Sequence, residues 1–357
     1  MQKPSIRMFS KSNKVFPYIF LAVLAIFTVL LGTSIGTVYV PFSTIIHIIT
    51  ANIIPSVPAD AIDSMYENIV WNIRLPRVLL SGLVGASLAI SGAAFQGLLR
   101  NPLADPYTLG VSSGASVGAV ITIFFGLTLP LLGPFTLPVF SILASFITIF
   151  IVLYFAQRID RAMRVETIIL TGVIFSSFLG ALISLMIALT GDELRQIIGW
   201  LLGSVSMRGW DHIKIIIPFF LVGSILLTLH AKELNAMSFG EEQAKHLGVN
   251  VERKKMSILI AGSILTGAAV AVSGTIGFVG LVIPHFVRIL WGPNHVHLLP
   301  LSAIAGGSFL ILADLVSRMI IAPSELPIGV ITALIGAPVF AVILIQRRKK
   351  LGGEKGS

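Results

Sequence analysis

WNIRLPRVLLSGLVGASLAISGAAFQGLLRNPLADPYTLGVSSGAS, residues 71–116, begins with two arginines and continues into an apolar run that is too long for a helix in a soluble core. Small residues recur in this run at every fourth position, which places them on one face of a helix. Such a face lets a second helix approach closely. Glycines repeat the same spacing further on. The residues with this predicted packing role are Ser81, Gly85, Ala89, Ala93, Gly97, Gly110, Gly114 and Gly118. The pattern favours two neighbouring helices of a tightly packed membrane bundle, and ordinary packing explains any single glycine here.

The composition indicates a protein that uses lipid as its solvent. Of its 357 residues, 55% are hydrophobic and 11% are charged, and the mean hydropathy is +0.95, whereas soluble domains carry about 25% charged residues. Apolar runs of about 20 residues recur, which predicts several membrane spans. The net charge of +9 comes from short basic clusters between these runs, a pattern typical of membrane topology rather than of nucleic-acid binding. The absence of cysteine excludes disulfides, thiolate metal sites and cysteine nucleophiles.

These features predict an all-α, polytopic membrane protein that forms a single transmembrane domain over residues 1–357. The basic N-terminal segment resembles a signal peptide, but it lacks a small-residue cleavage site, so the apolar run that follows is interpreted as a retained first span. About ten transmembrane helices are expected, at 15–35, 74–98, 108–126, 135–157, 165–190, 213–231, 255–275, a short helix opening at Pro284, 299–321 and 327–346. The segment 36–70 is mixed, and 191–212 has room for a short interfacial helix.

The distribution of positive charge predicts the orientation of the chain. An even number of spans with both ends inside makes 1–14, 232–254 and 347–357 cytoplasmic. Of the 25 Lys and Arg residues, 19 then lie inside, the bias expected of cytoplasmic loops. The six outside are Arg74, Arg77, Arg195, Arg208, Lys214 and Arg318.

The polar loop 232–254 is the first candidate functional segment. Ser238 and Glu241 have the spacing of a capping box, and Gly248 is a suitable helix terminator, so a short helix is expected at about 239–247. This helix is too polar to enter lipid. It is either a solvated surface helix or a lever presented to a cytoplasmic partner.

Three arginines at the predicted outer ends of spans are the second candidate. Arginine keeps its charge at any working pH and binds carboxylates through two hydrogen bonds. Arg74, Arg77 and Arg318 therefore suit an outer rim that receives an acidic partner. The alternatives are interfacial snorkelling and, for Arg318, a local pair with Asp314 one turn earlier.

Several classes of function find no support in the sequence. No acidic or basic residue stands at the centre of a span, which argues against a proton relay but not against sodium coupling through carbonyl groups. The chain has no Gly-Lys-Ser/Thr phosphate loop and no H-E-x-x-H metalloprotease motif. His295 and His297 alone are a weak metal signal, so no metal site and no bound cofactor are predicted.

Four stretches together resemble a known family: the quoted segment around IRLPR, GFVGLVIPHFVR, LADLVSR and ELPIGVITALIGAPVF. They are similar to the permease subunits of ABC importers for iron–siderophore complexes and vitamin B12, the FecCD family, over roughly residues 60–346. The resemblance implies the type II importer fold with ten helices and a dimer of identical or related permeases in a bacterial cell membrane. It also implies two cytoplasmic ATPase subunits, which bind ATP and Mg, and an extracytoplasmic binding protein, either periplasmic or a lipoprotein.

The resemblance also assigns roles to residues. Arg74, Arg77 and Arg318 match arginines that receive acidic residues of the binding protein. The loop that matches the ATPase-coupling helices contains Leu234, Ser238, Gly240, Glu241, Ala244, Leu247 and Gly248. Segment 36–70 is longer than in the B12-type pattern. A ferric siderophore is the expected cargo, with cobalamin or haem as alternatives within the family and an ion-coupled secondary transporter as the alternative outside it.

Overall fold

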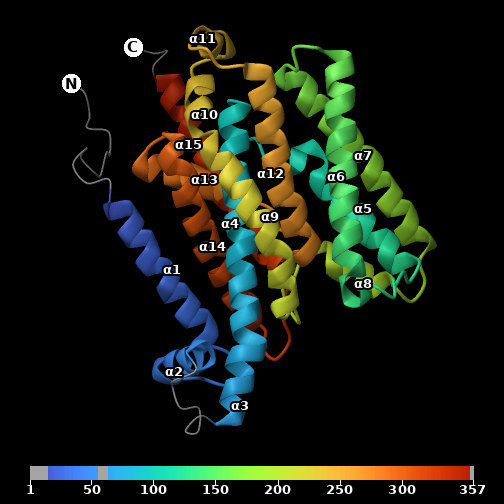
Figure 1. Cartoon of the computed structure of the whole chain (residues 1–357), viewed down its shortest axis with the longest axis vertical. Helices are drawn as coiled ribbons and strands as arrows, with labels where there is room; N and C mark the ends of the chain where they lie inside the picture. The colour runs from blue at the N-terminus through green and yellow to red at the C-terminus, as the bar shows by residue number, and fades with distance from the viewer. Residues whose placement is uncertain (1–14, 55–62, 354–357) are drawn as a thin grey trace.

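The computed structural model describes residues 15–54 and 63–353, and the regular structure within these ranges is helical throughout. The helices, in chain order, are α1 (Phe16–Ser34), α2 (Phe42–Ile53), α3 (Ser64–Glu67), the π-helix η1 (Asn68–Arg74), α4 (Leu75–Leu98), the 3-10 helix η2 (Pro106–Leu109), α5 (Val111–Phe124), the 3-10 helix η3 (Gly133–Phe135), α6 (Thr136–Ile159), α7 (Val165–Leu189), α8 (Leu194–Leu201), α9 (Trp210–Leu229), α10 (Ala231–Ser238), α11 (Glu241–His246), α12 (Val251–Ser273), α13 (Val279–Trp291), α14 (His295–Met319) and α15 (Ile328–Gly353). The long helices run roughly side by side (Figure 1). The predicted cytoplasmic segment 1–14 and residues 354–357 of the predicted tail lie outside the described residues.

The described helices account for the predicted membrane spans. Seven segments are long and apolar enough to cross a membrane, namely α1, Ser64–Leu98 with α4, Gly133–Ile159 with α6, α7, α9, α12 and α14. Three of the four shorter apolar helices, α5, α13 and the Ile328–Ile343 part of α15, coincide with further predicted spans, and the fourth is α2. The all-helical, polytopic fold is therefore confirmed.

Local sequence signals explain where several helices begin and end. Asn250 and Asn294 cap α12 and α14, because their side-chain oxygens accept backbone amides of the first turn. Gly274 and Gly292 end α12 and α13 in left-handed conformations (φ +70° and +99°) that suit glycine. The turn residues of the sequence thus separate one apolar run from the next.

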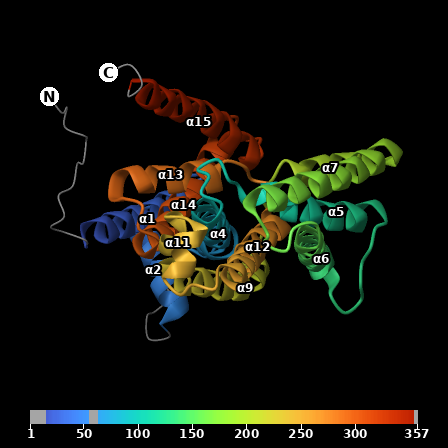
Figure 2. The ribbon, with the colours of Figure 1, turned by 90° about the horizontal axis from the view of Figure 1, so that it is seen from above.

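Helix α4 is the most buried of the membrane-length segments and lies at the centre of the bundle. It packs mainly against α14, and also against α12, α13 and α9. Viewed along its axis, α4 is surrounded by other helices (Figure 2). This central position explains why the quoted segment, rather than another apolar run, has a continuous face of small residues.

The five small residues of α4 are buried, and several stand where another helix comes very close. A Cβ atom at Gly85 would lie 2.2 Å from the carbonyl oxygen of Gly306 on α14, and one at Gly97 would lie 2.1 Å from Nε2 of His295. In α5, a Cβ at Gly114 would lie 2.2 Å from Oγ1 of Thr148 on α6. Gly118 approaches α6 in the same way. A larger side chain at Gly85, Gly114 or Gly118 requires movement of the partner helix, and one at Gly97 requires movement of the buried His295 ring.

Three local predictions need correction. Gly110 does not lie on a helix face: it is the left-handed residue (φ +79°) between η2 and α5. The short helix α13 begins at Val279, and Pro284 lies inside it. Ser238 does not cap a following helix, because α10 continues to Ser238 and its hydroxyl donates to the carbonyl of Asn235. The polar loop therefore contains two short helices, α10 and α11, instead of one, with Gly240 before the second.

The expected helix end at Gly248 and a short helix within 191–212 are present in the structure. Gly248 has a φ of +82°, and its amide donates to the carbonyl of Lys245 at the end of α11. The segment 191–212 contains α8, which is followed by an irregular loop that leads to α9.

Candidate functional site

Two regions at opposite ends of the bundle contain the predicted functional residues. The arginine cluster, defined as Arg74, Arg77 and Arg318 with Asp314 and Glu325, lies near the start of α4 and the end of α14. The lever segment, defined as residues 231–248 with α10 and α11, lies at the other end of the bundle (Figure 1). Opposite placement is what the predicted topology requires of an outer docking site and an inner coupling site.

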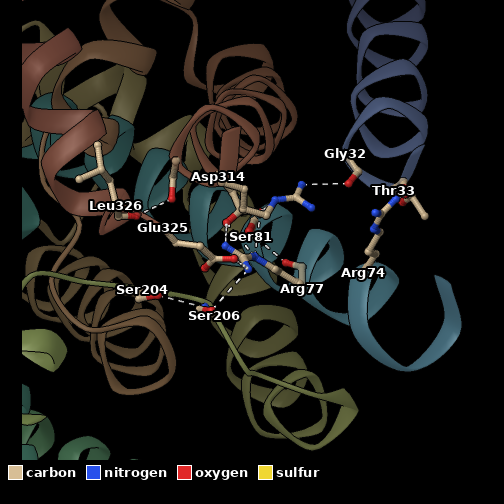
Figure 3. A network of polar contacts seen from close by, with 12 residues as sticks. Gly32, Thr33, Arg74, Arg77, Ser81, Ser204, Ser206, Asp314, Glu325 and Leu326 are labelled. Atoms are coloured by element: carbon tan, nitrogen blue, oxygen red, sulfur yellow. Dashed lines mark hydrogen bonds and ion pairs between the residues drawn. The ribbon is translucent and has the colours of Figure 1, made fainter. Parts of the chain in front are cut away.

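Arg77 is the centre of the arginine cluster. Its Nε and Nη2 donate to Oδ1 of Asp314 on α14 at 3.0 and 2.9 Å, and Nη1 donates to Oε1 of Glu325 at 2.8 Å (Figure 3). Asp314 is completely buried. The hydroxyl of Ser206, on the loop between α8 and α9, lies 3.4 Å from Nη1. One guanidinium group thus joins α4, α14 and two loops.

The other two arginines also have partners inside the chain. Arg318 Nε lies 3.2 Å from Oδ2 of Asp314, and its Nη2 donates to the carbonyl of Gly32 at 2.9 Å. Arg74 Nη1 donates to the carbonyls of Thr33 and Ser34 at 3.0 and 2.8 Å. These carbonyls belong to the last turn of α1, which lacks helical donors, so Arg74 acts as its cap. All three arginines are buried or nearly so, and the pair of Arg318 with Asp314 uses the i,i+4 spacing seen in the sequence.

Glu325 is the member of the cluster that faces outward. Its side chain is 36% exposed, in the loop between α14 and α15. Burial alone would raise the pKa of Glu325, but the hydrogen bond and charge of Arg77 outweigh it and hold this pKa below its ordinary value. Glu325 is therefore ionised at neutral pH and accessible at its edge, whereas Asp314 is sealed inside.

The lever segment is fastened to the bundle by one side of α10. Asn235 Oδ1 accepts the backbone amide of His295 at 2.8 Å and lies 2.9 Å from its Nδ1, and its Nδ2 donates to Asn294 at 2.9 Å. Leu234 is fully buried beside this contact. The N-terminus of α14 thus fixes α10 in place.

The predicted coupling residues divide between the inside and the surface of the lever segment. Leu234, Gly240 and Ala244 are buried, Glu241 is partly exposed, and Ser238, Leu247 and Gly248 are exposed. Gly240 has a φ of +127°, which favours glycine at the bend between the two helices. Buried members therefore set the shape of the segment, while exposed members form its outer surface.

The sequence analysis missed Phe239, which is 74% exposed before α11, as Leu247 is 71% exposed after it. Two large apolar side chains flank α11 on an otherwise polar loop. An isolated aromatic residue in a polar segment was the signal that could have identified this surface.

The two histidines considered as metal ligands have protein partners: His295 contacts Asn235, and Nδ1 of His297 lies 2.9 Å from the hydroxyl of Tyr18.

Taken together, many apolar helices packed around a central small-residue helix, with a polar segment held at one end, define an integral membrane protein of many spans. The FecCD transport family matches this chain over residues 24–346. The chain is 58% identical over 354 residues to an uncharacterized ABC transporter permease protein, YvrB, of Bacillus subtilis, covering 98% of this chain and 99% of the relative.

Two further comparisons agree. The chain is 44% identical to the cobalamin import system permease protein BtuC of Halobacterium salinarum, over 78% of this chain and 74% of that one. A solved structure, described as an inward-facing candidate metal-chelate type ABC transporter, matches with a TM-score of 0.80 and 34% identity, covering 94% of this chain and 100% of that one. This chain belongs to the FecCD family of ABC importer permeases, in which a separate subunit is the ATPase.

Proposed function

We propose that this chain is the permease subunit of an ATP-driven importer of ferric siderophores. The observation that carries the proposal is the likeness to a candidate metal-chelate type transporter over 94% of the chain. Cobalamin is the alternative favoured by the relative in Halobacterium salinarum, and haem is the alternative from the family resemblance. In this proposal the chain works as a dimer in a bacterial cell membrane with both termini in the cytoplasm, and ATP and Mg bind to the partner ATPase.

The binding protein is proposed to dock at the arginine cluster through an acidic side chain. Three arginines against two carboxylates leave one positive charge uncompensated, which attracts an acid. The guanidinium groups already have internal partners, so the incoming carboxylate reaches Arg77 from the side that Glu325 covers. We propose the contact at this edge because Glu325 is exposed, whereas Asp314, the other acid of the cluster, is buried.

The ATPase is proposed to dock on the lever segment. Exposed Phe239 and Leu247 supply the apolar area that a lasting contact needs, and the hydrogen bonds of Asn235 hold the segment against α14. ATP-driven movement of the docked ATPase then displaces the lever segment, and the bundle changes the side to which its central path opens.

The test is transport by the complete system in vesicles. Permease, ATPase and binding protein are reconstituted, and ATP-dependent uptake is measured for a panel of iron-labelled ferric siderophores, cobalamin and haemin. We expect saturable accumulation of a siderophore that requires all three proteins. If cobalamin or haemin accumulates and no siderophore does, that compound is the cargo instead. Accumulation by the permease alone under a sodium gradient would overturn the proposal in favour of a secondary transporter.

A further inference from the structure

Lys255 is a buried lysine that the transport function described so far does not use. It lies in the first turns of α12, and its side chain is 1% exposed. Its Nζ lies 2.6 Å from Oε1 of Glu241, the first residue of α11, and donates to the carbonyl of Met163 at 3.0 Å. A buried ammonium group is strongly disfavoured unless it is paired and hydrogen-bonded, so both contacts are needed to keep this lysine inside.

The two partners of Lys255 come from distant parts of the chain. Glu241 belongs to the lever segment, and Met163 belongs to the turn 160–164 between α6 and α7. That turn is itself held firmly, because the carboxylate of Asp160 accepts the amides of Ala162 and Arg164. One side chain therefore connects the lever segment, the start of α12 and a rigid turn of a second helical hairpin.

The position of α12 explains why this connection matters. Helix α12 packs against α9, α4, α6 and α5, so it touches the central helix and several of its neighbours. By contrast, α11 packs only slightly against α12. Between these two helices, the ion pair with Glu241 is the charged link within the described residues.

We infer that Lys255 is a positioning residue that transmits the movement of α11 to α12 and to the turn 160–164. This inference rests on the proposed function, because it needs an ATPase that moves the lever segment. Glu241 is partly exposed in the isolated chain. A docked ATPase covers it, and the lower local dielectric strengthens its attraction to Lys255. The link is therefore firmest when the lever segment is being moved.

The first test is the coupling ratio, the cargo transported per ATP hydrolysed, of the reconstituted complex. Lys255→Met keeps the length of the side chain and removes its charge. Lys255 is buried and cannot touch the ATPase, so ATPase association and basal hydrolysis persist, while the coupling ratio falls roughly tenfold. The matched control is Arg253→Met, which removes an exposed charge from the same turn and leaves the ratio unchanged. An unaltered ratio in folded Lys255→Met would overturn the inference and leave the proposed function intact.

A second measurement does not depend on that variant folding. The chain has no cysteine, so Arg161→Cys and Lys245→Cys, both at exposed positions, give it one pair of spin labels. The labelled chain is diluted with unlabelled chain and assembled with cysteine-free partner subunits, so that each labelled complex reports one distance. In the otherwise native complex we expect this distance to stay constant when ATP binds, because the turn and α11 move together. Separation of the labels on ATP binding would overturn the inference. If no ATPase associates with the native chain, the proposed function itself fails, and the two failures are distinguishable.

Discussion

Asp314 on α14 accepts hydrogen bonds from both Nε and Nη2 of Arg77 on α4, although 237 positions separate the two residues in the chain. The carboxylate is completely buried and also lies within ion-pair distance of Arg318. Because α4 and α14 form the main helix contact of the bundle, this pair fixes their relative register at one end. The opposite end of the same contact is set by Gly97 against His295.

Asp314→Ala is expected to destabilise the protein strongly. It removes the buried carboxylate that Arg77 and Arg318 share, and removing one partner of a buried pair costs about 3–5 kcal/mol. Thermal unfolding in detergent measures the effect. The control is Asp211→Ala, which breaks the exposed pair with Lys214 and should cost less than about 1 kcal/mol. Equal stability losses in the two variants would show that the buried ion pair contributes no more to the free energy of unfolding than the exposed one.

Gly85→Leu should disrupt the contact between α4 and α14. The new Cβ would lie 2.2 Å from the carbonyl oxygen of Gly306, a backbone atom that cannot turn aside. We expect a loss of about 3 kcal/mol or more, or failure to fold. Gly180→Leu on α7 is the matched control, because nothing lies within 4 Å of the position of its Cβ. Normal stability and uptake in Gly85→Leu would contradict the close approach.

The sequence predicted the spans and the small-residue face well because both depend on local periodicity. Local periodicity does not reveal contacts between segments that are distant in the sequence. Lys255 stands at the start of the predicted span 255–275, and nothing in its sequence neighbourhood shows that it would be buried against Glu241 and the carbonyl of Met163. The capping box at Ser238 failed because α10 continues through that residue. Even Arg318, whose pair with Asp314 was visible at i,i+4, also bonds to Gly32, which no pattern indicated.

Pro284 shows how a local rule is modified by a distant partner. Proline has no amide hydrogen, so the carbonyl of Gly280 four residues earlier lacks a helical donor. Gln96 Nε2 donates to this carbonyl at 3.2 Å and to that of Leu281 at 3.1 Å. Helix α13 therefore begins before the proline instead of at it. Gln96→Leu should remove these donors and destabilise the protein by about 1–3 kcal/mol in thermal unfolding, and no loss would show that other groups satisfy the carbonyls.

The pair of Arg77 with Glu325 should depend on pH on the acid side. The pKa of Glu325 in the folded protein lies below its ordinary value of 4.5. Its contribution to stability is therefore fully present above about pH 4.5 and is lost as the pH falls through the lowered folded pKa. Comparison of thermal unfolding of the native chain and Glu325→Gln between pH 6 and 3 measures it. The difference between the two should shrink toward acid pH, and a difference independent of pH would exclude the carboxylate as its source.

Glu325→Gln also tests the proposed docking edge. The variant removes a negative charge that competes for Arg77 and leaves the buried pair with Asp314 untouched. Binding of the acidic binding protein to the reconstituted permease should tighten by about two- to fivefold, more at low salt than at high salt. Glu67→Gln, which changes a partly exposed acid of α3 outside the arginine cluster, is the control. Weaker binding in Glu325→Gln would mean that Glu325 itself contacts the binding protein, instead of occupying the position beside Arg77 that the incoming carboxylate takes.

The exposed apolar pair of the lever segment gives the sharpest test of ATPase docking. Phe239→Ala and Leu247→Ala should each weaken association with the ATPase by about 1–3 kcal/mol, roughly tenfold in Kd, because side chains of this size at the centre of an interface carry much of its energy. Neither change should alter thermal stability of the permease alone, since both side chains are largely exposed. Leu131→Ala, an exposed leucine in the loop between α5 and α6, is the matched control and should leave the Kd unchanged. Native affinity in both variants would show that the ATPase does not contact the surface around α11. The ATPase would then not move α11 directly, and the proposed role of Lys255 would lose its source of movement.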